Sequence, residues 1–373
     1  TEGTVYKQGL QRVRRRYKTI IPNNFPGRGA LRSVPAILSC KITIFVTRIF
    51  APFRHRPPTR DRTGPGTEGM LPTPPAQIPT AMEYTPTLRN FGPAPTADEV
   101  STLLEKIGPQ ARRNCRTEVY KRCFGCIDLT SLGATDSRRS IGEFTRKAIE
   151  LPRHFPEAGS VASICVYPVF VETVGLAAGD SKMAITSVSG GFPSSQTYLE
   201  VKMLETAMAI ENGADEIDIV ISIGEMLDGE YDLAGNEIET LRAEIGDDAI
   251  LKVILESGTL SDPELIHKAA TIAMEAGADF IKTSTGKNGI AATPEAAVAM
   301  CLAIRQFAEK TGRKVGFKAA GGISTAESAA LYYSIVEEIL GEEWLTPERF
   351  RIGASSLANN LLSEIEGREI KYF

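Results

Sequence analysis

Phe280-Ile281-Lys282-Thr283-Ser284-Thr285-Gly286-Lys287 sets a lysine in the middle of an apolar run that ends in a glycine turn. With the period of two that a β-strand has, Lys282 shares one face with Phe280 and Ser284, and the residues between them lie on the other. A charged amine inside such a strand costs free energy unless its surroundings or its chemistry require it. The stretch therefore predicts a strand that presents Lys282 inward.

A second stretch, Val315-Gly316-Phe317-Lys318-Ala319-Ala320-Gly321-Gly322, repeats this plan with a central lysine and a glycine turn. Two inward lysines on two strands indicate amine chemistry, because one ammonium lowers the pKa of the other and a neutral amine is a nucleophile. The alternative is a pair of lysines that reach solvent or form ion pairs without a chemical role. The repetition of the pattern favours the chemical interpretation.

Charge is distributed unevenly along the 373 residues. Residues 1–80 hold 14 Lys and Arg against three acidic residues, which is about +11, so the total of -4 leaves the rest of the chain near -15. Such an acidic body argues against nucleic acid as a partner. No apolar run reaches the roughly 20 residues of a membrane span, which argues against a membrane partner as well.

Residues 1–80 show no sustained period of two or 3.6, and prolines recur from Pro57 to Pro79. These prolines would interrupt regular elements, so we predict a disordered basic arm. The composition also fits an organellar transit peptide, although serine is scarce. Translated upstream sequence is a further alternative, with Met70 or Met82 as the natural start.

Cysteine and histidine spacing predicts neither disulfides nor a metal site. Six cysteines in a chain of this length do not resemble a secreted disulfide framework. Cys123-x-x-Cys126 resembles a redox or zinc half-site, but no second pair complements it, and buried thiols are the favoured interpretation. The three histidines, His55, His154 and His267, cannot be assembled into a ligand set. A Schiff-base mechanism is therefore favoured over a zinc-dependent one.

From about residue 97 strands and helices alternate, after two short lead-in helices at 97–107 and 112–120. The predicted strands are 125–131, 161–167, 182–187, 216–222, 250–256, 279–284, 314–320 and 351–355. The predicted helices between them include 137–150, 196–212, 263–276, 294–309 and 325–340. This rhythm over roughly 250 residues is typical of a (β/α)8 TIM barrel, which we predict for residues 97–373. The alternative is a doubly wound open sheet, but no Gly-x-Gly-x-x-Gly turn follows the first strand.

One rule of alternation places charged side chains in the barrel lumen. If the aliphatic face of each strand packs outward against the helices, the alternate residues face inward. The inward residues include Asp128, Thr130, Cys165, Asp218, Lys252, Lys282 and Lys318. Buried charges must compensate one another, so a purely structural ion-pair network is one interpretation. Three lysines around two aspartates near the strand ends favour the other, a catalytic site.

Turns rich in glycine and serine follow the last two predicted strands. Gly321-Gly322 ends one of them, and Gly353-Ala354-Ser355-Ser356 ends the other and leads into a helix. Backbone N–H groups and a helix N-terminus often bind phosphate at these loops of a barrel. The two turns therefore predict an anionic substrate.

The chain from about residue 120 to residue 360 resembles the deoxyribose-phosphate aldolase family. The matching stretches are Ile127-Asp128-Leu129-Thr130, Cys165-Val166-Tyr167-Pro168, Gly191-Phe192-Pro193, Asp215-Glu216-Ile217-Asp218, Leu251-Lys252-Val253-Ile254, Phe280 to Lys287, Gly316 to Gly322 and Gly353 to Ser356. Two features depart from the family. Ala319 stands where a proline is common, and residues 1–80 have no counterpart.

The resemblance implies reversible cleavage of 2-deoxy-D-ribose 5-phosphate to acetaldehyde and D-glyceraldehyde 3-phosphate, without a cofactor, in cytoplasmic deoxyribonucleoside catabolism. It implies Lys282 as the Schiff-base former, Lys318 as its activating cation and Asp218 as the proton-transfer residue, with Lys252 and Asp128 holding that relay. The expected substrate contacts are Thr130, Cys165, Thr285, Gly286, Lys287, Gly321, Gly322, Ser355 and Ser356. A homodimer is compatible with the resemblance.

Three questions stay open at this point. Another Schiff-base barrel that acts on a different phosphosugar would share these residues, and so would a silent phosphosugar-binding regulator, although the intact lysines argue against the latter. Some family members have a mobile C-terminal tail whose tyrosine helps proton transfer. Tyr372 either reaches the strand ends in this way or rests on the surface beside Phe373.

Overall fold

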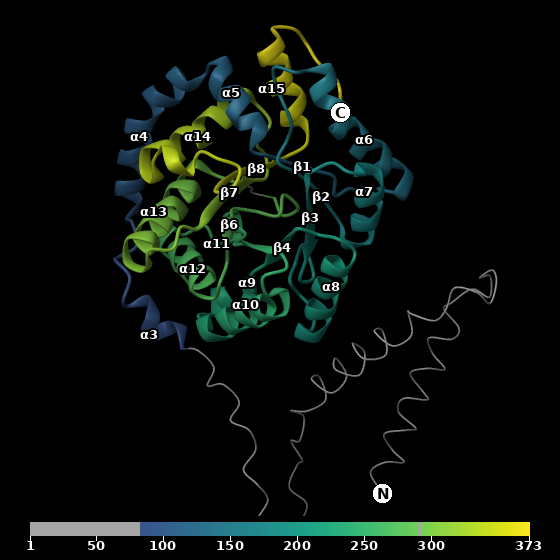
Figure 1. Ribbon diagram of the computed structural model, residues 1–373. Coiled ribbons are helices and arrows are strands. Elements are labelled where there is room, and N and C mark those ends of the chain that lie inside the picture. Colours follow the sequence, from purple (N-terminus) through teal and green to yellow (C-terminus); the bar gives the residue numbers. More distant parts are fainter. Residues whose placement is uncertain (1–82, 290–291) are drawn as a thin grey trace, which may run out of the picture. The chain divides into compact units, whose positions relative to one another are not determined.

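The computed structural model describes residues 83–289 and 292–373 (Figure 1). The predicted arm, residues 1–80, lies outside these described residues. Within them, eight parallel strands close into a barrel in chain order, and helices surround it. The predicted TIM barrel is therefore confirmed. In the described part of the chain, no helix is long and apolar enough to cross a membrane.

Each strand of the barrel pairs with the next along the chain, and the last pairs with the first. The strands are β1 (Ile127–Thr130), β2 (Ser163–Val166), β3 (Ala184–Ser189), β4 (Glu216–Val220), β5 (Ile250–Ile254), β6 (Phe280–Lys282), β7 (Gly316–Ala320) and β8 (Phe350–Ala354). On β4, Ile217 and Ile219 pack in the outer core, whereas Glu216 and Asp218 face the lumen. The period of two thus separates an aliphatic outer face from a charged inner face.

The helices cover the outside of the barrel. They are α3 (Tyr84–Leu88), α4 (Ala97–Asn114), α5 (Thr117–Gly125), α6 (Arg138–His154), α7 (Val171–Ala178), α8 (Leu199–Glu211), α9 (Ile223–Asp228), α10 (Tyr231–Ile245), α11 (Ser257–Leu260), α12 (Pro263–Glu275), α13 (Pro294–Thr311), α14 (Ala326–Leu340) and α15 (Ser356–Glu366), with 3-10 turns η1 (Pro168–Phe170) and η2 (Glu342–Trp344). Side-chain caps at Ser137, Thr293 and Thr325 begin three of them. The helices α3, α7, α9, α10 and α11 were not among those named in the prediction. Four of them, all except α10, are so short that they show little periodicity.

The second lead-in helix was predicted wrongly. The prediction began it at residue 112, but α4 continues to Asn114 through Pro109, and α5 begins only at Thr117. A capping box in which Thr96 and Glu99 bond each other's backbone starts α4, so the helix is well formed before it meets the proline. Cys123 in α5 and Cys126 after it are buried free thiols, as predicted.

The C-terminal segment folds back onto α6 and α15 (Figure 1). The Tyr372 hydroxyl donates to the Lys147 carbonyl oxygen at 3.0 Å, and the Tyr372 backbone N–H donates to Asn359 Oδ1 at 2.9 Å. The Tyr372 ring also meets the Phe155 ring edge-to-face, with centroids 5.3 Å apart. The structure therefore shows the surface alternative for this tyrosine rather than an approach to the strand ends.

Candidate active site

The three lumen lysines predicted from the sequence converge on Asp218. Lys282 Nζ and Lys318 Nζ each lie 2.8 Å from Asp218 Oδ2, and Lys252 Nζ lies 3.1 Å from Asp218 Oδ1. Adjacent strands produce this arrangement, because Asp218 pairs in register with Lys252 and Lys282 pairs with Lys318. The exposed fraction of Lys282 is 4%, and the other three are fully buried. The charges therefore interact where little bulk solvent reaches them.

A second layer of carboxylates completes the network. Asp128 forms an ion pair with Lys318 and lies 3.7 Å from Lys252, while Glu216 forms an ion pair with Lys252. Arg351 joins the two carboxylates, with Nη1 2.5 Å from Asp128 Oδ1 and Nη2 2.7 Å from Glu216 Oε1. All five predicted charged residues thus belong to one network, which also includes Arg351 and Glu216.

The sequence prediction missed Arg351, although the same alternation places it in the lumen. Arg351 lies between Phe350 and Ile352, which are both fully buried in the outer core, so its side chain turns inward. The predicted strand began at Arg351, and the preceding outward residue was therefore not counted. Gly353 shares the inward face, where a Cβ would lie 3.2 Å from Lys318 Cε. A larger residue there would crowd the lysine.

The electrostatic environment shifts the pKa of Lys282 in the opposite direction from those of the other two lumen lysines. Burial lowers the pKa of Lys282, and the Lys318 ammonium lowers it further, while the Asp218 carboxylate acts in the opposite direction. Burial also disfavours the charged forms of Lys318 and Lys252, but their carboxylate neighbours outweigh it and raise the pKa of both lysines. Lys282 is therefore the lumen lysine that gives up its proton most easily.

The carboxylates of the network stay ionised because neighbouring cations lower their pKa values. Burial favours the neutral form of Asp218, but the Lys252, Lys282 and Lys318 ammonium groups outweigh it and hold the pKa of this carboxyl far below its usual value. The pKa of Asp128 and that of Glu216 are lowered in the same way, with Arg351 among the causes. The lumen therefore holds carboxylates in their ionised form next to an amine that loses its proton easily.

A cavity of about 440 Å³ opens beside Lys282 at the carboxyl ends of the strands. The predicted site residues that line it are Thr130, Lys282, Thr285, Gly286, Lys287, Gly321, Gly322, Ser355 and Ser356. Cys165, the remaining predicted contact, is fully buried and packs in a small cluster with Leu132 and Val188. Of the three lumen lysines, Lys282 lines the cavity, so a molecule bound there would meet the amine whose pKa is lowered.

One side of this cavity gathers groups of the kinds that can hold an anion. Ser356 begins α15, and the preceding Ser355 makes no side-chain cap, so the first backbone N–H groups of the helix are left for a ligand. Gly321 and Gly322 have φ angles of +98° and +79°, a conformation that favours glycine and turns the backbone toward the cavity. Lys287 adds an ammonium group, which bonds the Leu132 carbonyl oxygen.

Glu256 supports the loop that carries Lys287, a role that the sequence did not reveal. This fully buried carboxylate accepts hydrogen bonds from Thr285 N at 3.2 Å, Thr285 Oγ1 at 2.5 Å and Asn288 Nδ2 at 3.2 Å. Its backbone has φ 54° and ψ 52°, a left-handed conformation that costs a non-glycine residue about 1 kcal/mol or more. Such a conformation depends on neighbouring strands and leaves no local sequence signal.

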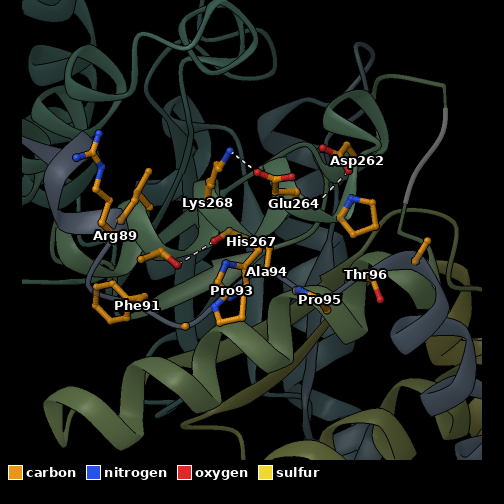
Figure 2. Close-up of a pocket in the computed structure, with 15 residues that line it drawn as sticks. Arg89, Phe91, Pro93, Ala94, Pro95, Thr96, Asp262, Glu264, His267 and Lys268 are labelled. Atoms are coloured by element: carbon orange, nitrogen blue, oxygen red, sulfur yellow. Dashed lines mark hydrogen bonds and ion pairs between the residues drawn. The ribbon is translucent and has the colours of Figure 1, made fainter.

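A larger cavity, about 560 Å³, lies outside the barrel between the segment from Leu88 to Ala97 and α12 (Figure 2). Two of its ionisable side chains, Lys268 and His267, bond to protein groups. Lys268 Nζ lies 2.7 Å from Glu264 Oε1 (Figure 2). His267 Nε2 lies 2.8 Å from Gln306 Oε1. None of the predicted site residues lines it. The smaller cavity at the strand ends is therefore the candidate active site.

Comparisons with known proteins agree with this geometry. The model of the DeoC/LacD family aldolases matches residues 131–356. Deoxyribose-phosphate aldolases from Mus musculus and Homo sapiens are each 40% identical over 270 residues, which cover 69% of this chain and 85% of each relative.

A solved structure shows the same fold. The deoxyribose phosphate aldolase from Aeropyrum pernix, described as a tetramer, has a TM-score of 0.54 and 23% identity, and the match covers 73% of this chain and 99% of that one. At this identity the likeness concerns the fold alone. The family match spans more than half of the sequence, and it includes the lysine strands and the cavity loops. The chain therefore belongs to the DeoC/LacD family of aldolases.

Proposed function

We propose that this aldolase cleaves 2-deoxy-D-ribose 5-phosphate reversibly to acetaldehyde and D-glyceraldehyde 3-phosphate through a Schiff base on Lys282. The observation that carries the proposal is the position of Lys282, which lines the cavity and has a lowered pKa. The names of the mouse and human relatives support this choice of substrate. The family resemblance also suggests a role in deoxyribonucleoside catabolism in the cytoplasm.

The proposed reaction begins with attack of the neutral Lys282 amine on the C1 aldehyde carbon of the open-chain sugar. Loss of water gives a protonated imine, which withdraws electrons from the C2–C3 bond. As the C3 hydroxyl loses its proton, this bond breaks, its electron pair forms the enamine and D-glyceraldehyde 3-phosphate leaves. Protonation of C2 and hydrolysis of the imine then release acetaldehyde and restore Lys282.

Asp218 is the proposed proton-transfer residue in these steps. Its Oδ2 lies 2.8 Å from both Lys282 Nζ and Lys318 Nζ, so it is next to the atoms where the charge changes. Acting through a water molecule, it would take the C3 hydroxyl proton and later deliver a proton to C2. Lys252 and Asp128 fix the position of this carboxylate and of Lys318.

Borohydride trapping tests the proposed mechanism. Reduction in the presence of acetaldehyde should leave a stable ethyl group on Lys282, because hydride adds to the imine carbon. Peptide mass mapping would locate the adduct, and Lys202, which is buried outside the lumen beside Glu237, serves as an internal control. An adduct on Lys318 or Lys252, with Lys282 unmodified, would overturn the assignment.

Ser356→Glu should raise KM for the phosphorylated sugar by about tenfold or more and change KM for free deoxyribose much less. The added carboxylate at the first residue of α15 would repel the phosphate dianion and occupy the backbone N–H groups. Ser140→Glu, in the first turn of α6 and away from the cavity, is the matched control and should affect neither KM. Equal losses on both sugars in the Ser356 variant would show that this loop does not bind the phosphate.

A further inference from the structure

The charged network in the lumen contains more cations than carboxylates. Among the described residues it consists of four cations and three carboxylates: Lys252, Lys282, Lys318, Arg351, Asp128, Glu216 and Asp218. The inward residues of β2 and β3 that meet this network are neutral, because burial raises the pKa of the Cys165 thiol and Thr186 carries a hydroxyl. If every group were ionised, one positive charge would be uncompensated.

Three charged side chains near the strand ends, Asp136, Glu256 and Lys287, make no ion pair with this network. Asp136 accepts hydrogen bonds from Ser131 and Gly133, and Glu256 accepts them from Thr285 and Asn288. Lys287 donates to a backbone carbonyl oxygen. These three side chains bond to neutral partners at the strand ends, whereas each member of the lumen network contacts an opposite charge within 4 Å.

A surplus of buried charge is costly, so the network favours the loss of a proton from one of its cations. Arginine cannot lose its proton in a protein. Lys252 contacts Glu216, Asp218 and Asp128, and Lys318 contacts Asp128 and Asp218. Lys282 contacts Asp218 alone among the charged groups of the network. It therefore loses the least attraction on becoming neutral.

Arg351 is the cation that creates the surplus. Its guanidinium bridges Asp128 and Glu216, the two carboxylates that also pair with Lys318 and Lys252. Without Arg351, three lysines would face three carboxylates and all could stay protonated. We propose that Arg351, which does not line the cavity, is a positioning residue that keeps the Lys282 amine uncharged by supplying the fourth positive charge. The proposal rests on the Schiff-base role proposed for Lys282.

Arg351→Met should move the acid limb of the kcat/KM profile upward by about one to two pH units. The pH dependence of borohydride trapping at Lys282 should shift by the same amount, because both measurements follow the neutral amine. Turnover should fall about tenfold at neutral pH and recover in alkaline buffer. A loss caused only by misfolding would not recover at high pH.

Two further variants separate charge from shape. Arg351→Lys keeps the charge but loses the planar fork that contacts two carboxylates, so a wild-type pH profile is expected if charge is what matters. The double variant Arg351→Met/Glu216→Gln leaves three cations and two carboxylates, which restores the surplus of one. It should return the acid limb of the kcat/KM profile toward the wild-type position. Each single variant, in contrast, changes the difference between the numbers of cations and carboxylates.

The outcomes distinguish this inference from the proposed function. An adduct on Lys282 in the wild-type enzyme, together with an unshifted profile in folded Arg351→Met, would overturn the role of Arg351 alone. If Arg351→Met does not fold, the other two variants decide. A shifted kcat/KM pH profile in Arg351→Lys or in the double variant would then overturn the role of Arg351. A wild-type enzyme that forms no adduct on Lys282 would overturn the proposed mechanism, and the inference with it.

Discussion

Lys282→Met should abolish turnover while leaving the barrel folded. We expect kcat to fall by about 10⁴-fold or more, because Lys282 lines the cavity and the other two lumen lysines, Lys252 and Lys318, do not. The free energy of unfolding should stay constant or rise by about 1 kcal/mol, because three cations would then face three carboxylates. Steady-state kinetics and urea unfolding measure the two quantities.

The control for this variant is Lys202→Met, which should show the reverse pattern. Lys202 is buried between α8 and α10, where Nζ lies 2.7 Å from Glu237 Oε1 and donates to Ser195 Oγ at 2.7 Å. Its removal should lower stability, because Ser195 loses this partner and Glu237 loses its cation, but kcat of the folded enzyme should change little. If Lys282→Met kept more than about a hundredth of wild-type turnover, Lys282 would not be the nucleophile.

Asp218→Asn should keep imine formation and slow carbon–carbon cleavage by about 10²- to 10⁴-fold. An amide at this position cannot accept the C3 hydroxyl proton, whereas the attack of Lys282 does not require it. We also expect a loss of about 3 kcal/mol or more in the free energy of unfolding, because four cations would then face two carboxylates. Single-turnover experiments would compare the rate of adduct formation on Lys282 with the rate of D-glyceraldehyde 3-phosphate release.

Glu216→Gln is the matched control for Asp218→Asn. It removes the same charge from the same strand, but Glu216 contacts Lys252 and Arg351 rather than Lys282. Stability should fall in both variants, whereas cleavage should be slowed much more in Asp218→Asn. Equal cleavage rates in the two variants would assign the effect to the lumen charge and would remove Asp218 from the proton transfer.

The positions of Lys282, Lys318 and Asp218 inside a barrel could be predicted from the sequence for a physical reason. The period of two in a strand couples each residue to one face of the sheet, so local alternation is enough to separate the lumen from the outer core. The Gly321-Gly322 turn after β7 is a local feature of the same kind. Eight repeats of this pattern with helices between them specified the barrel.

The tertiary structure decided which of these inward residues meet. Arg351 and Asp128 are 223 residues apart in the sequence, and they touch because β8 closes the barrel against β1. The balance of four cations and three carboxylates exists only after all the strands are in register. The lowered pKa of Lys282 therefore depends on the assembled lumen and cannot be derived from its own strand.

The same distinction applies outside the lumen. The left-handed backbone of Glu256 and the docking of Tyr372 on α6 both result from contacts between segments that are distant in sequence. Composition and periodicity describe the conformation that one segment prefers. They do not describe the contacts that the segment makes with distant segments after folding. By itself the sequence determined the barrel, its inner face and its lysines. Only closure of the barrel decided how their charges are balanced, because that balance belongs to the whole ring of strands.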